Sequence, residues 1–220
     1  MPSKSRNAFD ENAKDVKALL DLHKEKGGTA PGRRFGLEVL NKSAVVLITA
    51  FWESYCEDIA AEGLKHVVTH APDSNSLPKD LKKIVLKKLA DDKNELSVWG
   101  LADEGWRKVL EQQLDTLQEQ RNRRLNTPKA ANIDDLFFNA LGISKISSTW
   151  KWDKTNATKA RNHLDKFVEL RGAVAHRGKA GAAVKKKQAT DYFDLVKKLA
   201  AKTGGKVNTH VKSITGKSLW

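Results

Sequence analysis

The stretch from Leu37 to about Thr69 restricts the possible folds more than any other part of the chain. Its centre, from Val45 to Trp52, is apolar on nearly every face of a helix, which is typical of a helix that neighbours bury on all sides. The alternation of apolar and polar residues that marks a half-buried strand is absent from the sequence. We therefore predict an all-α fold, a helical bundle built around this long central helix.

The other helices are predicted from apolar residues at helical spacing, with glycine and proline between them. Asn132 is expected to cap the N-terminus of one of these helices, and Gly142 is expected to end it. The predicted ranges are about 7–26, 78–89, 103–124, 133–141, 157–175 and 190–202.

The charge of the chain is concentrated near its C-terminus. Of the net charge of +13, residues 1–143 contribute nothing, whereas residues 144–220 hold 18 Lys and Arg against 5 Asp and Glu. A field of this sign favours a polyanion, because each phosphate contact releases condensed counterions. Nucleic acid is preferred over a membrane surface, since no basic amphipathic helix carries an aromatic face. A solvated basic surface that serves solubility is the alternative.

Several classes of protein are excluded by simple features. The single cysteine, Cys56, excludes an internal disulfide framework and a Cys-rich zinc module, and it fits a reducing compartment. The longest stretch without charge, from Ser43 to Trp52, is too short to span a bilayer, and the N-terminus has no apolar signal core. We expect a cytoplasmic protein with no membrane partner.

Arg171 interrupts the apolar stripe of the helix predicted over 157–175. That stripe consists of Ala160, Leu164, Phe167, Val168 and Val174. A guanidinium cannot be neutralised, so one that lies in an apolar seam needs a carboxylate, a carbonyl or a phosphate as its partner. A structural role, with Glu53 of the central helix as the paired acid, and a role in phosphate binding both remain open.

His176 follows Arg171 by five residues, with Gly172 between them. In a continuous helix the two side chains point about 140° apart, too far round to grip one group. They converge if the helix ends or distorts near Gly172, or if two copies of the segment meet across a two-fold axis. An imidazole among cations suits proton transfer, because it titrates near neutral pH.

Arg171 and His176 have the Arg-(four to six residues)-His spacing of the HEPN superfamily, whose active members are metal-independent ribonucleases. The surrounding sequence resembles the RiboL-PSP branch over roughly residues 43–200. The similar stretches are 50–58, 124–128, 132–137, 141–143, Trp150 and 170–178. The resemblance implies a HEPN-like helical domain over 43–203. Residues 1–42 would add a helix and a Gly/Pro-containing loop packed on the bundle, and residues 204–220 a basic extension.

The resemblance also implies a homodimer formed through the motif-bearing helices, so that two Arg/His pairs line one cleft. His176 would transfer a proton to or from the RNA 2′-hydroxyl or the leaving oxygen, and Arg171 would hold the scissile phosphate. The products would be a 2′,3′-cyclic phosphate and a 5′-hydroxyl, with no cofactor and no metal. Such an endoribonuclease would be a toxin-like or defence effector, with an antitoxin or other regulatory partner.

Other basic residues near the motif are expected to contact RNA. These residues are Arg161, Arg177, Lys179, Lys185 and Lys186. Glu53 and Gly172 are expected to support the pair. Gly172 also departs from the family, which usually has a polar residue after the arginine. A catalytically inactive HEPN-type module that binds RNA or a protein therefore remains the alternative function.

Two further patterns leave alternatives open. Glu62, His66 and His70 are spaced so that they share one helix face, but no further ligand cluster accompanies them, and we expect a solvated polar stripe. Trp150 and Trp152 either pack in the protein or contact RNA by stacking on a base.

Overall fold

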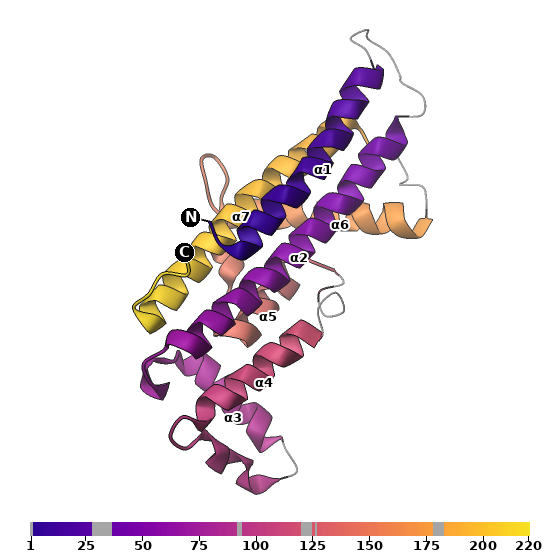
Figure 1. Cartoon of the computed structure of the whole chain (residues 1–220). Helices are drawn as coiled ribbons and strands as arrows, with labels where there is room; N and C mark the ends of the chain where they lie inside the picture. Colours follow the sequence, from indigo (N-terminus) through magenta and orange to yellow (C-terminus); the bar gives the residue numbers. More distant parts are fainter. Residues whose placement is uncertain (1, 28–36, 92–93, 120–124, 126, 178–182) are drawn as a thin grey trace.

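The computed structural model describes residues 2–27, 37–91, 94–119, 125, 127–177 and 183–220. Within these residues the secondary structure is helical, and no strand is present; one isolated bridge joins Trp152 and Thr155. This confirms the predicted all-α fold (Figure 1). No helix in the described ranges has the length and apolar character that crossing a membrane requires.

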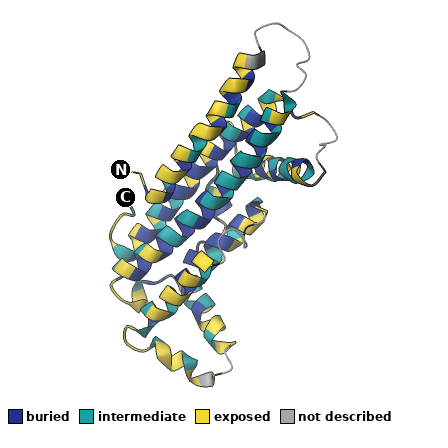
Figure 2. Cartoon of the chain, turned by 45° about the vertical axis from the view of Figure 1, so that its right-hand side comes forward, coloured by how far each residue is buried: buried dark blue, intermediate teal, exposed yellow. Residues whose placement is uncertain are grey.

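The centre of the bundle is α2 (Glu38–His70), which packs most extensively against α7 (Lys186–Thr215) and α1 (Lys4–Gly27). These three long helices run side by side along the molecule (Figure 1). Buried residues occur on successive turns of α2 from Asn41 to Val68 (Figure 2), as expected for a helix covered on all sides.

The other face of α2 carries α4 (Gly105–Glu119), α5 (Ala130–Leu141) and α6 (Ala157–Arg177). The helix α3 (Lys79–Ala90) and the 3₁₀ segment η2 (Glu95–Leu101) pack together at one end of the molecule, where many of their residues are exposed (Figure 2). Two shorter 3₁₀ segments are η1 (Ser74–Ser76) and η3 (Ile146–Thr149).

Trp150 belongs to the core. Its side chain is fully buried, its indole lies edge-on to Trp52 with ring centroids 6.0 Å apart, and its Nε1 donates a hydrogen bond of 2.9 Å to Thr203. This bond satisfies the polar atom of a buried indole. Of the two alternatives for Trp150, packing is therefore the one that the structure supports.

The expected helix cap at Asn132 is wrong. The helix α5 begins two residues earlier, at Ala130, and its cap position is Lys129, which makes no side-chain cap bond. Asn132 lies inside the first turn and donates to the carbonyl oxygen of Thr127. The predicted end is confirmed, because Gly142 adopts the left-handed conformation (φ 69°) that glycine accepts without strain.

The last helix is longer than the predicted range 190–202. It continues through Gly204 and Gly205 to Thr215, so most of the segment 204–220 is helical, and Val207, Val211 and Ile214 are buried. Glycine at position 204 permits close packing, since a Cβ there would lie 2.5 Å from the Tyr55 hydroxyl. The Tyr55 hydroxyl donates to the carbonyl oxygen of Ala200 across this contact. Gly204 is thus required for packing, and the glycine pair does not end the helix.

Candidate functional site: the Arg171 seam between α2, α6 and α7

Arg171 lies on α6 in the seam predicted from the sequence. Ala160, Leu164 and Val168 of the same stripe are buried, and the Arg171 side chain is half-buried among them. Its Nε is buried and has no hydrogen-bond acceptor among the described residues. A buried N–H donor that stays unpaired lowers the stability of a fold by about 1–3 kcal/mol, so Arg171 destabilises the protein unless a ligand pairs with it.

Glu53 of α2 lies within electrostatic reach of this guanidinium. Burial and the nearby carboxylate of Glu57 raise the pKa of Glu53 to about 7, while Arg171 acts in the opposite direction. In the described part of the chain no hydrogen bond or ion pair joins Arg171 to a carboxylate. The sequence left open a structural ion pair between Arg171 and Glu53. The described structure shows no such pair, only a longer-range electrostatic attraction.

Tyr192 of α7 closes the third side of the seam. Its ring stacks on Phe167 of α6 with centroids 4.4 Å apart, and its hydroxyl lies 2.9 Å from the Thr49 hydroxyl of α2. Burial raises the pKa of Tyr192 well above its usual range, so the phenol is neutral. Sequence reasoning missed Tyr192, because its partner Thr49 lies 143 positions away and no local pattern joins them.

Helix α6 runs without a break from Ala157 through Gly172 to Arg177. Of the two conditions for convergence, an end or distortion of the helix near Gly172 is not met, because α6 continues through Gly172 to Arg177. A continuous helix places the Cα–Cβ directions of Arg171 and His176 about 140° apart. His176 is the next-to-last helical residue, and its side chain lies outside the described residues. One copy of α6 therefore does not bring the two positions onto one face.

Gly172 has free space around it. A Cβ at this position would meet no other heavy atom within 4 Å, so the side chain that the family usually carries here is not excluded by packing. Packing in the described structure therefore does not require glycine at position 172.

An open groove of about 1080 Å³ lies between α6 and the first turns of α7. Phe167, Leu170 and Leu195 form apolar parts of its wall, and polar and charged side chains line its edges, including the acids Glu169 and Asp191. The others include His163, Lys166, Lys185 and Gln188. Lys185, a predicted RNA contact, is thus beside the motif helix, while sequence reasoning missed His163 and Lys166. His163 and Lys166 precede Leu170 by seven and four residues, so all three share one face of α6. This spacing was visible in the sequence.

The remaining predicted RNA contacts are not gathered at this groove. Arg161 lies 3.6 Å from the carboxylate of Asp134 on α5, and Asp134 also accepts hydrogen bonds from Ser147. Lys186 is half-buried at the first residue of α7. Arg177 ends α6 with its side chain outside the described part, and Lys179 lies outside it altogether.

The polar stripe of α2 ties the two ends of the chain to the bundle. Glu62 accepts hydrogen bonds from the backbone of Lys4 and Ser5 and from the Ser5 hydroxyl. His66 bonds to the carbonyl oxygen of Lys217 at 3.1 Å, and its ring centroid lies 4.6 Å from that of His70. Among the residues with described side chains, no group of three His, Cys, Asp or Glu is placed to hold a metal ion.

The model of the RiboL-PSP-HEPN family matches residues 10–208, which include most of α1, the motif and most of α7. No curated protein and no solved structure matches the chain significantly.

Proposed function

Because the chain belongs to the RiboL-PSP-HEPN family, we propose that it is a metal-independent endoribonuclease whose reaction depends on Arg171 and His176. The observation that carries this proposal is the guanidinium of Arg171. It is held in an apolar seam, it donates to no hydrogen-bond acceptor in the described structure, and burial raises the pKa of Glu53, an acid within electrostatic reach, to about 7. A cation in this state is available to a phosphate.

Arg171 binds the scissile phosphodiester in this account. The planar guanidinium matches two phosphate oxygens, and its charge opposes the negative charge that grows in the transition state. Phe167 and Tyr192 keep the seam narrow and apolar on two sides, which strengthens the attraction by excluding water. Glu53 supports the arginine from α2 and weakens its positive field only when it loses its proton.

His176 transfers the proton. As a base it takes the proton of the RNA 2′-hydroxyl, whose oxygen attacks the phosphorus, while the 5′-oxygen leaves with a proton supplied by an acid. The products are a 2′,3′-cyclic phosphate and a 5′-hydroxyl. Because the two positions point about 140° apart on one helix, we propose that Arg171 of one copy works with His176 of a second copy in a homodimer formed through α6.

RNA cleavage in the presence of EDTA tests this function. The wild-type protein should cut labelled single-stranded RNA in EDTA, and His176→Ala and Arg171→Ala should each lose at least about 100-fold in rate. Circular dichroism and the elution volume of the dimer serve as controls for folding. Cleavage that stops with chelation, or that persists in His176→Ala, contradicts the proposal.

The second candidate is a catalytically inactive module that binds RNA or protein, and Gly172 is the observation that favours it. A polar side chain would fit at this position, yet glycine stands there. RNA that shifts on a gel but stays uncut over hours supports this candidate. In either case a toxin-like or defence role with a regulatory partner such as an antitoxin is the biological setting that we propose, on the family membership alone.

A further inference from the structure

The final part of the chain carries only positive charge. Asp194 is the last acidic residue, and the segment 195–220 contains Lys197, Lys198, Lys202, Lys206, Lys212 and Lys217. All but Lys217 lie on α7. Trp152, which precedes the start of α6, lies beside Lys198 on this part of α7.

Three of these lysines form a row on the exposed face of α7. Lys198, Lys202 and Lys212 are exposed and lie within an arc of about 80° around the helix axis, at 100° per residue. They extend over about 21 Å along the axis, at 1.5 Å per residue. We call Lys198, Lys202 and Lys212 the α7 lysine row; half-buried Lys206 lies at its edge.

The lysine row is not neutralised by neighbouring acids. Lys202 and Lys212 make no ion pair or hydrogen bond with any described residue, and the Lys198 ammonium lies 5.6 Å from the ring centre of Trp152. Lys197, in contrast, is 2.7 Å from the carboxylate of Asp194 and lies outside the row. The positive field of the row is therefore fully available to a ligand.

An aromatic pocket borders the lysine row. It has a volume of about 310 Å³ and is lined by Gly204, Gly205 and Trp220 among others, and by the charged pair Arg6 and Asp10. The indole of Trp220 is 39% exposed and lies 3.6 Å from where a Cβ of Gly204 would be. A hydrogen bond of 2.7 Å from the backbone of Leu219 to Asn208 holds this segment against α7. Both ends of the chain meet beside α7 (Figure 1).

We infer that the α7 lysine row and the Trp220 pocket form a second surface for single-stranded RNA, separate from the Arg171 seam. The lysines contact successive phosphates, and a base enters the pocket and stacks on Trp220, with Arg6 at the rim. Arg6 is paired with Asp10 at 2.9 Å, so it contributes little net charge. The choice of RNA as the polyanion rests on the proposed function, but the surface does not depend on cleavage.

RNA explains this surface better than a membrane does. A basic row beside an aromatic side chain is the arrangement that binds the backbone and bases of a single strand. A membrane-binding face needs several exposed apolar side chains beside its lysines. Of the large apolar residues that are exposed in the described structure, only Trp220 is near the row. The others are on α1, α2, α3 and η2: Leu22, Val39, Leu86, Leu96, Val98 and Trp99.

The test measures binding of a fluorescein-labelled 12-nucleotide oligouridine by anisotropy, in the His176→Ala background so that the probe stays intact. The triple variant Lys198→Gln, Lys202→Gln, Lys212→Gln should bind more weakly. Its slope of log affinity against log salt should be shallower by about 2, from roughly 0.7 for each lost phosphate contact. Trp220→Ala should lose roughly 5- to 150-fold in affinity with its salt slope unchanged, since stacking is not ionic.

Two matched variants control for general effects. The exposed lysines of α3 give the triple Lys79→Gln, Lys83→Gln, Lys87→Gln, and the 78% exposed Trp99 of η2 gives Trp99→Ala. Both should bind the probe like the parent. If the α3 triple loses as much affinity as the α7 triple, or if only vesicles of phosphatidylserine and phosphatidylcholine are bound, the inference is wrong. If the wild-type protein cuts no RNA but the α7 triple variant loses binding, the RNA-binding surface is supported and the proposed ribonuclease activity is contradicted.

Discussion

The carboxyl group of Glu53 and the guanidinium of Arg171 attract each other across the contact between α2 and α6 without forming an ion pair. Two opposite charges in an apolar seam are usually joined by hydrogen bonds, because an unpaired charge is costly to bury. Here the acid instead holds its proton up to a pKa of about 7. The arginine is thereby left with spare donors at neutral pH, as a phosphate-binding group requires.

The first prediction concerns the pH dependence of stability. The pKa of Glu53 is raised from 4.5 to about 7 in the folded protein, so the folded state binds more protons than the unfolded state between these values. The contribution of Glu53 to the free energy of unfolding should therefore be largest below pH 4.5 and should fall as the pH rises through 7. Urea unfolding at pH 5 and pH 8 measures it.

Glu53→Gln is the variant that isolates this contribution. It should gain stability relative to the wild type at pH 8 and not at pH 5, whereas exposed Glu11→Gln on α1 should change both alike. His66 and His210, whose pKa values burial lowers, act in the opposite sense in both proteins and cancel in the comparison. If the difference in the free energy of unfolding between wild type and Glu53→Gln is the same at both pH values, the raised pKa of Glu53 is contradicted.

The second prediction separates charge from geometry at Arg171. Arg171→Lys keeps the positive charge but loses the planar pair of donors, so RNA cleavage should fall by about 100-fold or more. RNA affinity measured without turnover should change far less than the cleavage rate, because most phosphate contacts lie elsewhere. Equal cleavage by Arg171→Lys and wild type in single-turnover assays would show that only a charge is needed there.

The third prediction uses two glycines in helices. Gly172→Ala should raise the free energy of unfolding by roughly 0.5–1 kcal/mol, since alanine favours the helix and the Cβ meets open space. Gly204→Ala should lower it, because the Cβ would lie 2.5 Å from the Tyr55 hydroxyl and would displace its bond to Ala200. Urea unfolding of both variants measures these changes. A loss of stability in Gly172→Ala would contradict the open space around this position.

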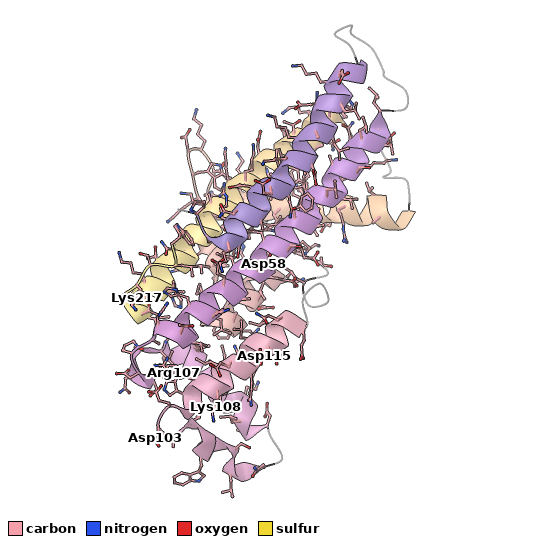
Figure 3. The ribbon with its side chains drawn as sticks, in the orientation of Figure 1. Asp58, Asp103, Arg107, Lys108, Asp115 and Lys217 are labelled. Carbon is pink, nitrogen blue, oxygen red and sulfur yellow. The ribbon has the colours of Figure 1, made fainter. Side chains whose placement is uncertain are left out.

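Arg107 of α4 makes contacts that no periodicity in the sequence indicates. Arg107 donates from its guanidinium to the carbonyl oxygens of Val68 and Ala71 at 2.6 and 2.7 Å, and so satisfies acceptors at the C-terminal end of α2 (Figure 3). Its guanidinium also lies 4.2 Å from the ring centre of Trp106. A half-buried arginine thus has a structural use in this protein, and the absence of such acceptors at Arg171 Nε in the described structure is the contrast.

The sequence was sufficient for the features that depend on neighbours along the chain. The central helix and the end of α5 at Gly142 follow from apolar content and from the conformational freedom of glycine. The length of α7 did not follow, because two adjacent glycines normally end a helix and only the distant Tyr55 explains Gly204. The cap at Asn132 failed for a similar reason: Asp165 of α6 accepts the hydrogen bond of the first helical N–H, at Ala130, from outside the local sequence.

The same limit applies to the candidate site. Their apolar surroundings made Glu53 a candidate partner for Arg171, and the structure brings the two within electrostatic reach. The stacking of Phe167 on Tyr192 and the groove at Lys185 depend on how α6 and α7 pack, which no periodicity within one helix specifies. In the proposed dimer the His176 that works with Arg171 belongs to a second copy, and the periodicity of one chain does not specify that pairing.

Mixing two inactive variants tests the central claim most directly. If Arg171 of one copy works with His176 of the other, a heterodimer of Arg171→Ala and His176→Ala contains one complete site. Unfolding the two variants together and refolding them should then restore about a quarter of the wild-type cleavage rate, since half of random dimers are mixed and each has one of two sites. Recovery of that size in EDTA is the predicted result. Refolded mixtures that form dimers but cut no RNA, although the wild type refolded in parallel does, would contradict the account.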